Sequence, residues 1–93
     1  MIFYFMELEF VFRKSAFKHD LGEADIRNAF KTCCYMGQYG DHENVYLLLG
    51  FDMKANPVEI LYNEYVEYGV NVFHAMQCQN RFLPLLEREE RNE

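Results

Sequence analysis

Histidines and basic side chains at two places in the chain are the residues best suited to chemistry. Lys18 and His19 are adjacent, and His74 and Arg81 lie near the other end. An imidazole can act as general acid or base in phosphodiester cleavage, while a nearby Lys or Arg can stabilise the negative charge of the transition state. The candidate catalytic residues are therefore His19, Lys18, His74 and Arg81.

Each histidine also has a structural alternative. His19 could hydrogen-bond its own turn and hold Asp20. In a regular strand His74 shares side-chain parity with Val72 and Met76, so we expect it to lean toward a core-facing row. A histidine there would serve as a hydrogen-bonded core residue, unless it lies at the exit of the strand beside the basic residues.

The distribution of charge indicates where RNA could bind. The net charge of −6 excludes binding driven by a positive field over the whole protein. Residues 13–31, however, hold five basic and three acidic side chains, whereas residues 32–80 hold one basic and six acidic. These charges are either one RNA-facing surface or the solvated faces of two helices. The amide of Gln79 could bind RNA or cap a following helix. Candidate RNA contacts are Arg13, Lys14 and Gln79.

No sequence motif indicates a cofactor or a metal. The five glycines are scattered, and neither a phosphate-binding loop nor a zinc-protease motif is present. Cys33, Cys34 and Cys78 are an odd number with two adjacent members, which is a poor disulfide framework. We expect reduced, half-buried thiols. Two other roles for the cysteines are less favoured. One is a zinc site formed by all three with a distant His, and the other is a nucleophilic Cys78 beside His74.

Alternating and helical patterns predict the elements that position these residues. Leu8, Phe10 and Phe12 alternate, as in a half-buried strand, and Ile26, Ala29 and Phe30 recur at helical spacing. Both parities are apolar over 45–53, which is typical of a strand covered on both faces. We predict strands at 7–12, 33–39, 45–53, 58–66 and 70–76, helices at 15–20 and 23–32, and a possible short helix from Gln79 or Asn80.

The short connections at 54–57 and 67–69 favour antiparallel pairing. We therefore predict an α+β fold in which an antiparallel meander sheet of about four to five strands carries two N-terminal helices on one face. Residues 1–93 form one domain, and residues 84–93 are expected to be a charged, fraying tail. The apolar residues 1–6 lack a basic leading region and are soon followed by acids, so we expect a cytoplasmic protein with no membrane segment.

Several short motifs occur in an order that resembles the BrnT-like toxins of the wider RelE-like group. They are residues 16–21 (AFKHDL), 23–26 (EADI), 47–50 (LLLG), 58–61 (VEIL) and 74–76 (HAM). The resemblance spans roughly residues 10–83. It implies a compact α+β toxin that cleaves RNA and is neutralised by a partner antitoxin protein.

The resemblance carries over residue by residue, with two departures. Lys18 and His19 match the family's basic residue and His, and His74 begins the matching strand-end tripeptide. Asp20 stands where the family usually has Gly, which Asp can replace in a left-handed turn. Gln79 stands where the family often has Arg, with Arg81 two residues later. If Arg81 does not supply the missing charge, the chain would be a catalytically degenerate protein-binding module on the same scaffold.

Overall fold

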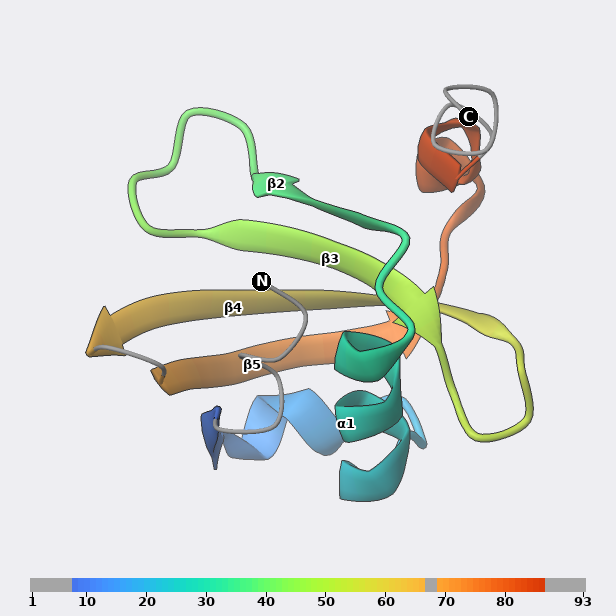
Figure 1. Cartoon of the computed structure of the whole chain (residues 1–93), viewed down its shortest axis with the longest axis horizontal. Helices are drawn as coiled ribbons and strands as arrows, with labels where there is room; N and C mark the ends of the chain where they lie inside the picture. Colours follow the sequence, from blue (N-terminus) through green and yellow to red (C-terminus); the bar gives the residue numbers. More distant parts are fainter. Residues whose placement is uncertain (1–7, 67–68, 87–93) are drawn as a thin grey trace.

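Five strands form one mixed sheet, against which one α-helix and a 3-10 turn pack (Figure 1). The computed structural model describes residues 8–66 and 69–86. In chain order the elements are β1 (Glu9–Phe12), η2 (Lys14–Phe17), α1 (Glu23–Lys31), β2 (Tyr35–Gln38), β3 (Tyr46–Phe51), β4 (Pro57–Val66), β5 (Gly69–Gln77) and η3 (Asn80–Phe82). A helical turn at 83–86 follows η3. The predicted α+β class and the short C-terminal helix are confirmed.

The order of the strands in the sheet is β1-β5-β4-β3-β2. Each pair from β2 to β5 is antiparallel, as the short connections predict. The prediction of a wholly antiparallel meander is wrong at β1, which runs parallel to β5 with Phe10 opposite Val70 and Phe12 opposite Val72. Alternation places the same side chains on the core face for either strand direction, so the pattern could not fix this pairing.

Only one of the two predicted N-terminal helices is an α-helix. The helix expected at 23–32 is α1, in which Asp25 accepts a hydrogen bond from the backbone nitrogen of Gly22 (3.1 Å). The other, expected at 15–20, is the 3-10 turn η2, so that prediction is wrong. Asp20 has a φ of 69°, and this left-handed conformation ends the helical path before a second turn forms.

Hydrogen bonds attach η2 to the edge of β5. The backbone nitrogen of Arg13 donates to the carbonyl of Val72 (2.9 Å), and the hydroxyl of Ser15 donates to the carbonyl of Phe73. The segment therefore continues along the edge of β5 beyond the end of β1.

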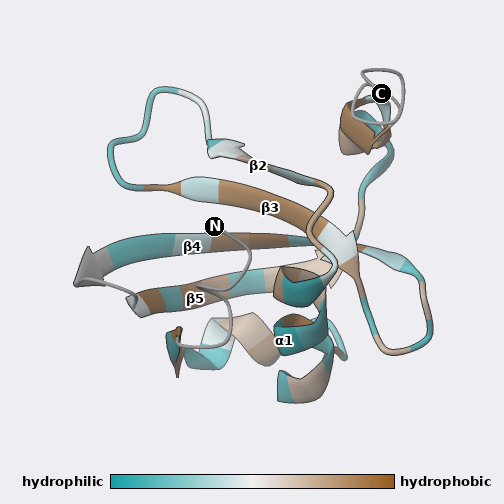
Figure 2. Cartoon of the chain, viewed as in Figure 1, coloured by the Kyte–Doolittle hydropathy of each residue, from teal (hydrophilic) through white to brown (hydrophobic). Residues whose placement is uncertain are grey.

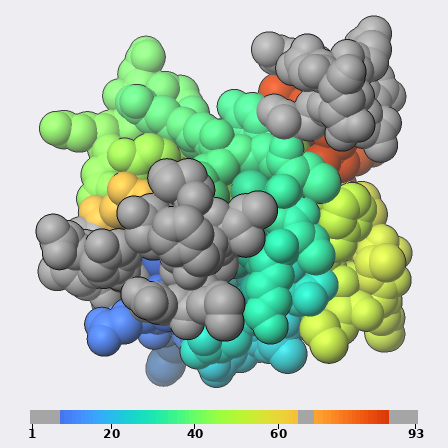
Figure 3. Space-filling view, in the orientation of Figure 1, coloured from blue at the N-terminus to red at the C-terminus, as the bar shows by residue number. Residues whose placement is uncertain are grey.

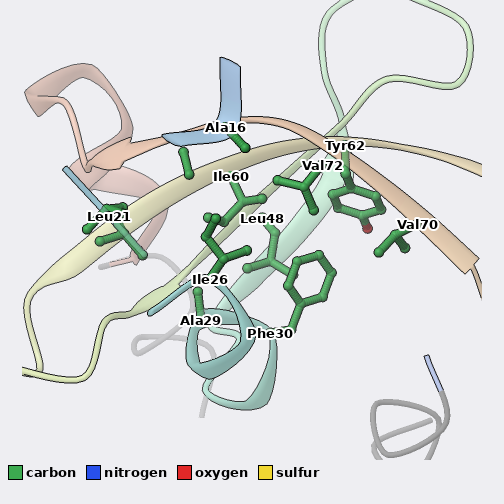
Figure 4. Close-up of a cluster of buried hydrophobic side chains, with 12 residues drawn as sticks. Ala16, Leu21, Ile26, Ala29, Phe30, Leu48, Ile60, Tyr62, Val70 and Val72 are labelled. Atoms are coloured by element: carbon green, nitrogen blue, oxygen red, sulfur yellow. The ribbon is translucent and has the colours of Figure 1, made fainter. Parts of the chain in front are cut away.

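The main core lies between the sheet and the elements α1 and η2 (Figure 4). Phe30 from α1 packs against Phe10 and Tyr62, with ring centroids 5.0 and 5.3 Å away. Buried residues of this cluster are Ala16, Leu21, Ile26, Ala29, Phe30, Leu48, Val58, Ile60, Tyr62, Val70, Val72 and Ala75. Burial of this apolar surface supplies most of the driving force for folding.

The opposite face of the sheet is partly covered by the C-terminal segment. Leu47, Leu49 and Phe82 form the buried part of this second cluster, with Leu61 and Cys78 half-buried around them. Residues 47–50 are all buried, which confirms the prediction that this strand is covered on both faces. In Figure 2, most of β3 is brown, whereas the loop that joins it to β2 is teal.

The loop between β3 and β4 is built around the buried carboxylate of Asp52. Its Oδ1 accepts from the backbone nitrogens of Lys54 and Asn56, and its Oδ2 accepts from Gln77 (2.9, 2.9 and 3.3 Å). The backbone nitrogen of Met53 donates to Asp25 of α1 (3.0 Å). Figure 3 shows the surface of this loop, in yellow, directly beside that of α1, in teal.

Three predictions fall on residues outside the described part of the chain. They are the start of the first strand before residue 8, the turn at 67–68, and the end of the charged tail at 87–93. Within the described residues, no helix combines the length and the apolar character that crossing a membrane requires.

Candidate functional site

A β-bulge in β5 decides where His74 points. Opposite β4, Tyr62 pairs with Val72 and Leu61 pairs with His74, so Phe73 is an extra residue between them. The bulge breaks the regular alternation, and Val72 and His74 lie on opposite faces of the sheet. The prediction that His74 leans toward the row of Val72 is therefore wrong. Its side chain is 24% exposed at the edge of the second cluster.

Glu59 of β4 is the partner of His74. The carboxylate is buried, with 1% of the residue exposed. Its Oε2 lies 2.9 Å from Nε2 of His74 and accepts from Nε2 of Gln79 at 2.8 Å, while Oε1 accepts from the backbone nitrogen of Gln79 at 2.9 Å. Both oxygens are thus hydrogen-bonded, as a buried carboxylate requires.

His19 reaches the same place from the other end of the chain. The rings of His19 and His74 lie 5.8 Å apart, with an angle of 68° between their planes. The hydrogen bond from the Ser15 hydroxyl to the Phe73 carbonyl anchors η2 beside β5. Asp20, whose backbone has the left-handed conformation, follows His19 directly. The two predicted catalytic histidines are therefore brought together, and His19 is exposed.

The predicted basic residues divide into two groups. Arg13, Lys14 and Lys18 are all exposed and belong to the short segment that ends at His19. Arg81 lies elsewhere, because its guanidinium donates to the hydroxyl of Tyr39 (3.3 Å) and stacks over the ring of Phe82 (4.5 Å). The basic residues closest to His19 in the sequence therefore belong to its own exposed segment, whereas Arg81 lies with the second cluster.

Gln79 is held inside the site. The sequence left two roles open for its amide, which were RNA binding and capping of the last helix. In the structure, its side-chain and backbone nitrogens both donate to Glu59. Gln79 is also the residue before η3, but its side chain makes no capping bond there.

Glu59 is the residue that the sequence analysis missed. It stands between Val58 and Ile60, where simple alternation assigns a polar residue to solvent. A signal was nevertheless present, since residues 45–53 are apolar on both parities. A neighbouring strand therefore has little open surface on either side, and an acid within it needs a buried partner.

The three cysteines are half-buried thiols, as predicted. Burial, and then the negative charge of Glu59, raise the pKa of the Cys78 thiol above its usual range. The thiol donates to the carbonyl of Gln79 (3.6 Å). This environment favours the protonated form, which is the poorer nucleophile.

Over residues 8–66 and 69–86, no three His, Cys, Asp or Glu side chains come together as a metal site would require. No protein-family model matches this sequence, and no curated protein matches it either. The chemistry of the site must therefore be inferred from its geometry.

Proposed function

We propose that this protein is a metal-independent endoribonuclease, and that it acts as the toxin of a bacterial toxin–antitoxin pair. One observation carries the enzymatic part of the proposal. His19 and His74, from opposite ends of the chain, meet at a ring distance of 5.8 Å, and His74 is hydrogen-bonded to a buried carboxylate. The resemblance to BrnT-like toxins supports the toxin part.

Two adjacent imidazoles suit the cleavage of RNA by its own 2′-hydroxyl. One imidazole takes the proton of that hydroxyl, and the other supplies a proton to the leaving 5′-oxygen. Lys18, which is adjacent to His19 in the chain, can stabilise the charge on the phosphoryl oxygens. Arg13 and Lys14 would hold the neighbouring phosphates.

An antitoxin would silence this site by covering the basic segment at 13–18. Complementary charge guides such association and blocks wrong partners. An acidic antitoxin surface is therefore expected over Arg13, Lys14 and Lys18, which are the exposed cations nearest to His19 in the sequence.

The placement of Arg81 favours a second candidate function. Arg81 contacts Tyr39 and Phe82, and the residue that bonds Glu59 is the uncharged Gln79, so these contacts do not bring to Glu59 the cation that the resemblance implies. The chain would then be a degenerate protein-binding module on the same scaffold.

Cleavage of a labelled single-stranded RNA in the presence of a chelator tests the enzymatic proposal. We expect fragments with 2′,3′-cyclic phosphate and 5′-hydroxyl ends. Replacing His19 or His74 by Ala should lower the rate by about 10²–10⁴-fold. The matched control is His42→Ala, which removes an exposed loop histidine and should leave the rate unchanged. No cleavage by the native protein, or equal cleavage by all variants, would contradict the proposal.

A further inference from the structure

We infer that Glu59 and Gln79 form a positioning device that fixes the imidazole of His74, so that His74 acts as the general base through Nδ1 while His19 acts as the acid. This inference rests on the proposed ribonuclease function. It assigns different tasks to the two histidines, and it gives a task to a buried carboxylate that the cleavage step does not touch.

The hydrogen bonds of Glu59 determine which nitrogen of His74 carries the proton. A carboxylate only accepts, so the nitrogen that faces Oε2 at 2.9 Å must be the protonated one, which is Nε2. In neutral His74 the other nitrogen, Nδ1, is then the acceptor. Since the side chain is partly exposed, a substrate can approach the ring.

Gln79 holds the carboxylate in place. Its two nitrogens bond one oxygen each, so Glu59 can neither rotate nor withdraw from His74 without losing both bonds. An amide achieves this without bringing a positive charge, and the negative charge of Glu59 remains available to the imidazolium that forms during the reaction. An Arg at this position would instead form an ion pair with Glu59 in competition with His74.

In the cleavage step, His74 accepts one proton and His19 donates one. Neutral His74 accepts the proton of the ribose 2′-hydroxyl at Nδ1 while that oxygen forms its bond to phosphorus. The bond from phosphorus to the 5′-oxygen breaks, and the imidazolium of His19 donates its proton to that oxygen. The products are a 2′,3′-cyclic phosphate and a 5′-hydroxyl, and proton exchange with water returns both histidines to their starting states.

Nitrogen-15 NMR of the intact protein tests the positioning directly, at an alkaline pH where imidazoles are neutral. We expect His74 in the native protein to be the tautomer with hydrogen on Nε2. In Glu59→Gln, which has almost the same shape, we expect a mixture of tautomers. The native measurement needs no variant to fold, and finding hydrogen on Nδ1 in the native protein would overturn the inference.

Kinetics on the same variant test the consequence for catalysis. Glu59→Gln should lower kcat about 10–100-fold, the usual cost of losing an orienting partner, with KM within about twofold of native. Glu64→Gln is the matched control, because Glu64 is exposed on the same strand, and it should change neither. An unchanged kcat in Glu59→Gln would overturn the inference while leaving the ribonuclease proposal intact. If the native protein shows the expected tautomer but never cleaves RNA, the ribonuclease proposal fails instead, and Glu59 still fixes the ring.

Discussion

The backbone of Ala29 in α1 lies so close to Gly50 in β3 that a Cβ added at Gly50 would sit 2.1 Å from the carbonyl oxygen of Ala29. The helix can rest on the sheet at this point only because the strand has no side chain there. This contact sets the distance between the two layers that enclose the main core.

Gly50→Ala should therefore lower the free energy of unfolding by about 3 kcal/mol, because the obstruction is backbone and cannot rotate away. Chemical denaturation of the two proteins measures the difference. Gly22→Ala is the control, since the nearest atom to its added Cβ is a side-chain oxygen at 3.9 Å, and it should cost less than about 1 kcal/mol. Equal effects of the two substitutions would contradict the close-packing argument.

Ala55→Gly should stabilise the protein. Ala55 has a φ of 68°, a left-handed conformation that is strained for any residue with a Cβ. Removing the Cβ should raise the free energy of unfolding by about 0.5–1 kcal/mol, read from the shift of the denaturation midpoint. The same change at Ala24, an exposed residue of α1, should have the opposite sign and cost about 1 kcal/mol. A loss of stability in Ala55→Gly would contradict this reading of the loop.

The stability supplied by Asp52 should disappear in acid. Burial alone would raise the pKa of Asp52, but hydrogen bonds from Asn56, Gln77 and Lys54 outweigh it and hold the pKa below its usual range. A lowered pKa in the folded state means that the carboxylate stabilises the protein above the pKa of the unfolded chain. That contribution is lost as the pH falls through the folded pKa.

Unfolding of the native protein and of Asp52→Asn at several pH values measures this effect. We expect Asp52→Asn to be less stable by about 1 kcal/mol at neutral pH, and the difference to shrink below about pH 4. Asp41→Asn, in an exposed loop, should stay within about 0.5 kcal/mol of native at neutral pH. A difference for Asp52→Asn that grows toward acid would have the wrong sign for a lowered pKa.

Gln79→Arg separates the two candidate functions. In the ribonuclease, the new guanidinium would pair with Glu59 and displace its bond to His74, so we expect cleavage to fall about 10–100-fold. In a degenerate binding module, the same change would restore a missing cation, and toxicity would appear only in the variant. Growth of bacteria after induced expression, together with RNA cleavage by the purified proteins, distinguishes these outcomes.

The two predicted phosphate contacts, Lys18 and Arg81, should differ in importance. Lys18 is next to His19, so Lys18→Ala should reduce cleavage by about 10²-fold or more. Arg81→Ala breaks contacts with Tyr39 and Phe82 and should change the rate less than about threefold. The rates of the two variants on one RNA provide the test, and a larger loss for Arg81→Ala would place Arg81 in the site after all.

Local patterns predicted most of the fold because each depends on neighbours in the sequence. The spacing of Ile26, Ala29 and Phe30 fixed the buried face of α1, and the apolar run at 45–53 revealed a strand covered on both sides. The direction of β1 was beyond such reasoning, since pairing with β5 joins residues about sixty positions apart and both directions bury the same side chains.

The site was predictable in its parts but not in its assembly. The types of His19 and His74 suggested acid–base chemistry, and the structure brings their rings together. The partner of His74 could not be predicted, because the bulge at Phe73 reverses the face of every later residue in β5. A rule of strict alternation therefore placed His74 on the face of Val72, away from Glu59.

The bulge at Phe73 changes which residues of β5, odd-numbered or even-numbered, face each side of the sheet. Before Phe73, the even-numbered residues Val70 and Val72 face the main core, whereas after it the odd-numbered Ala75 does so. The strand therefore contributes to the main core along its length and still presents the imidazole of His74 on the opposite face.

Deleting Phe73 would place His74 directly after Val72, so regular alternation would keep His74 opposite Leu61 and Ala75 opposite Ile60, on the faces they occupy now. The deletion would instead remove the carbonyl that accepts the Ser15 hydroxyl, and would weaken the attachment to β5 of the segment that carries His19.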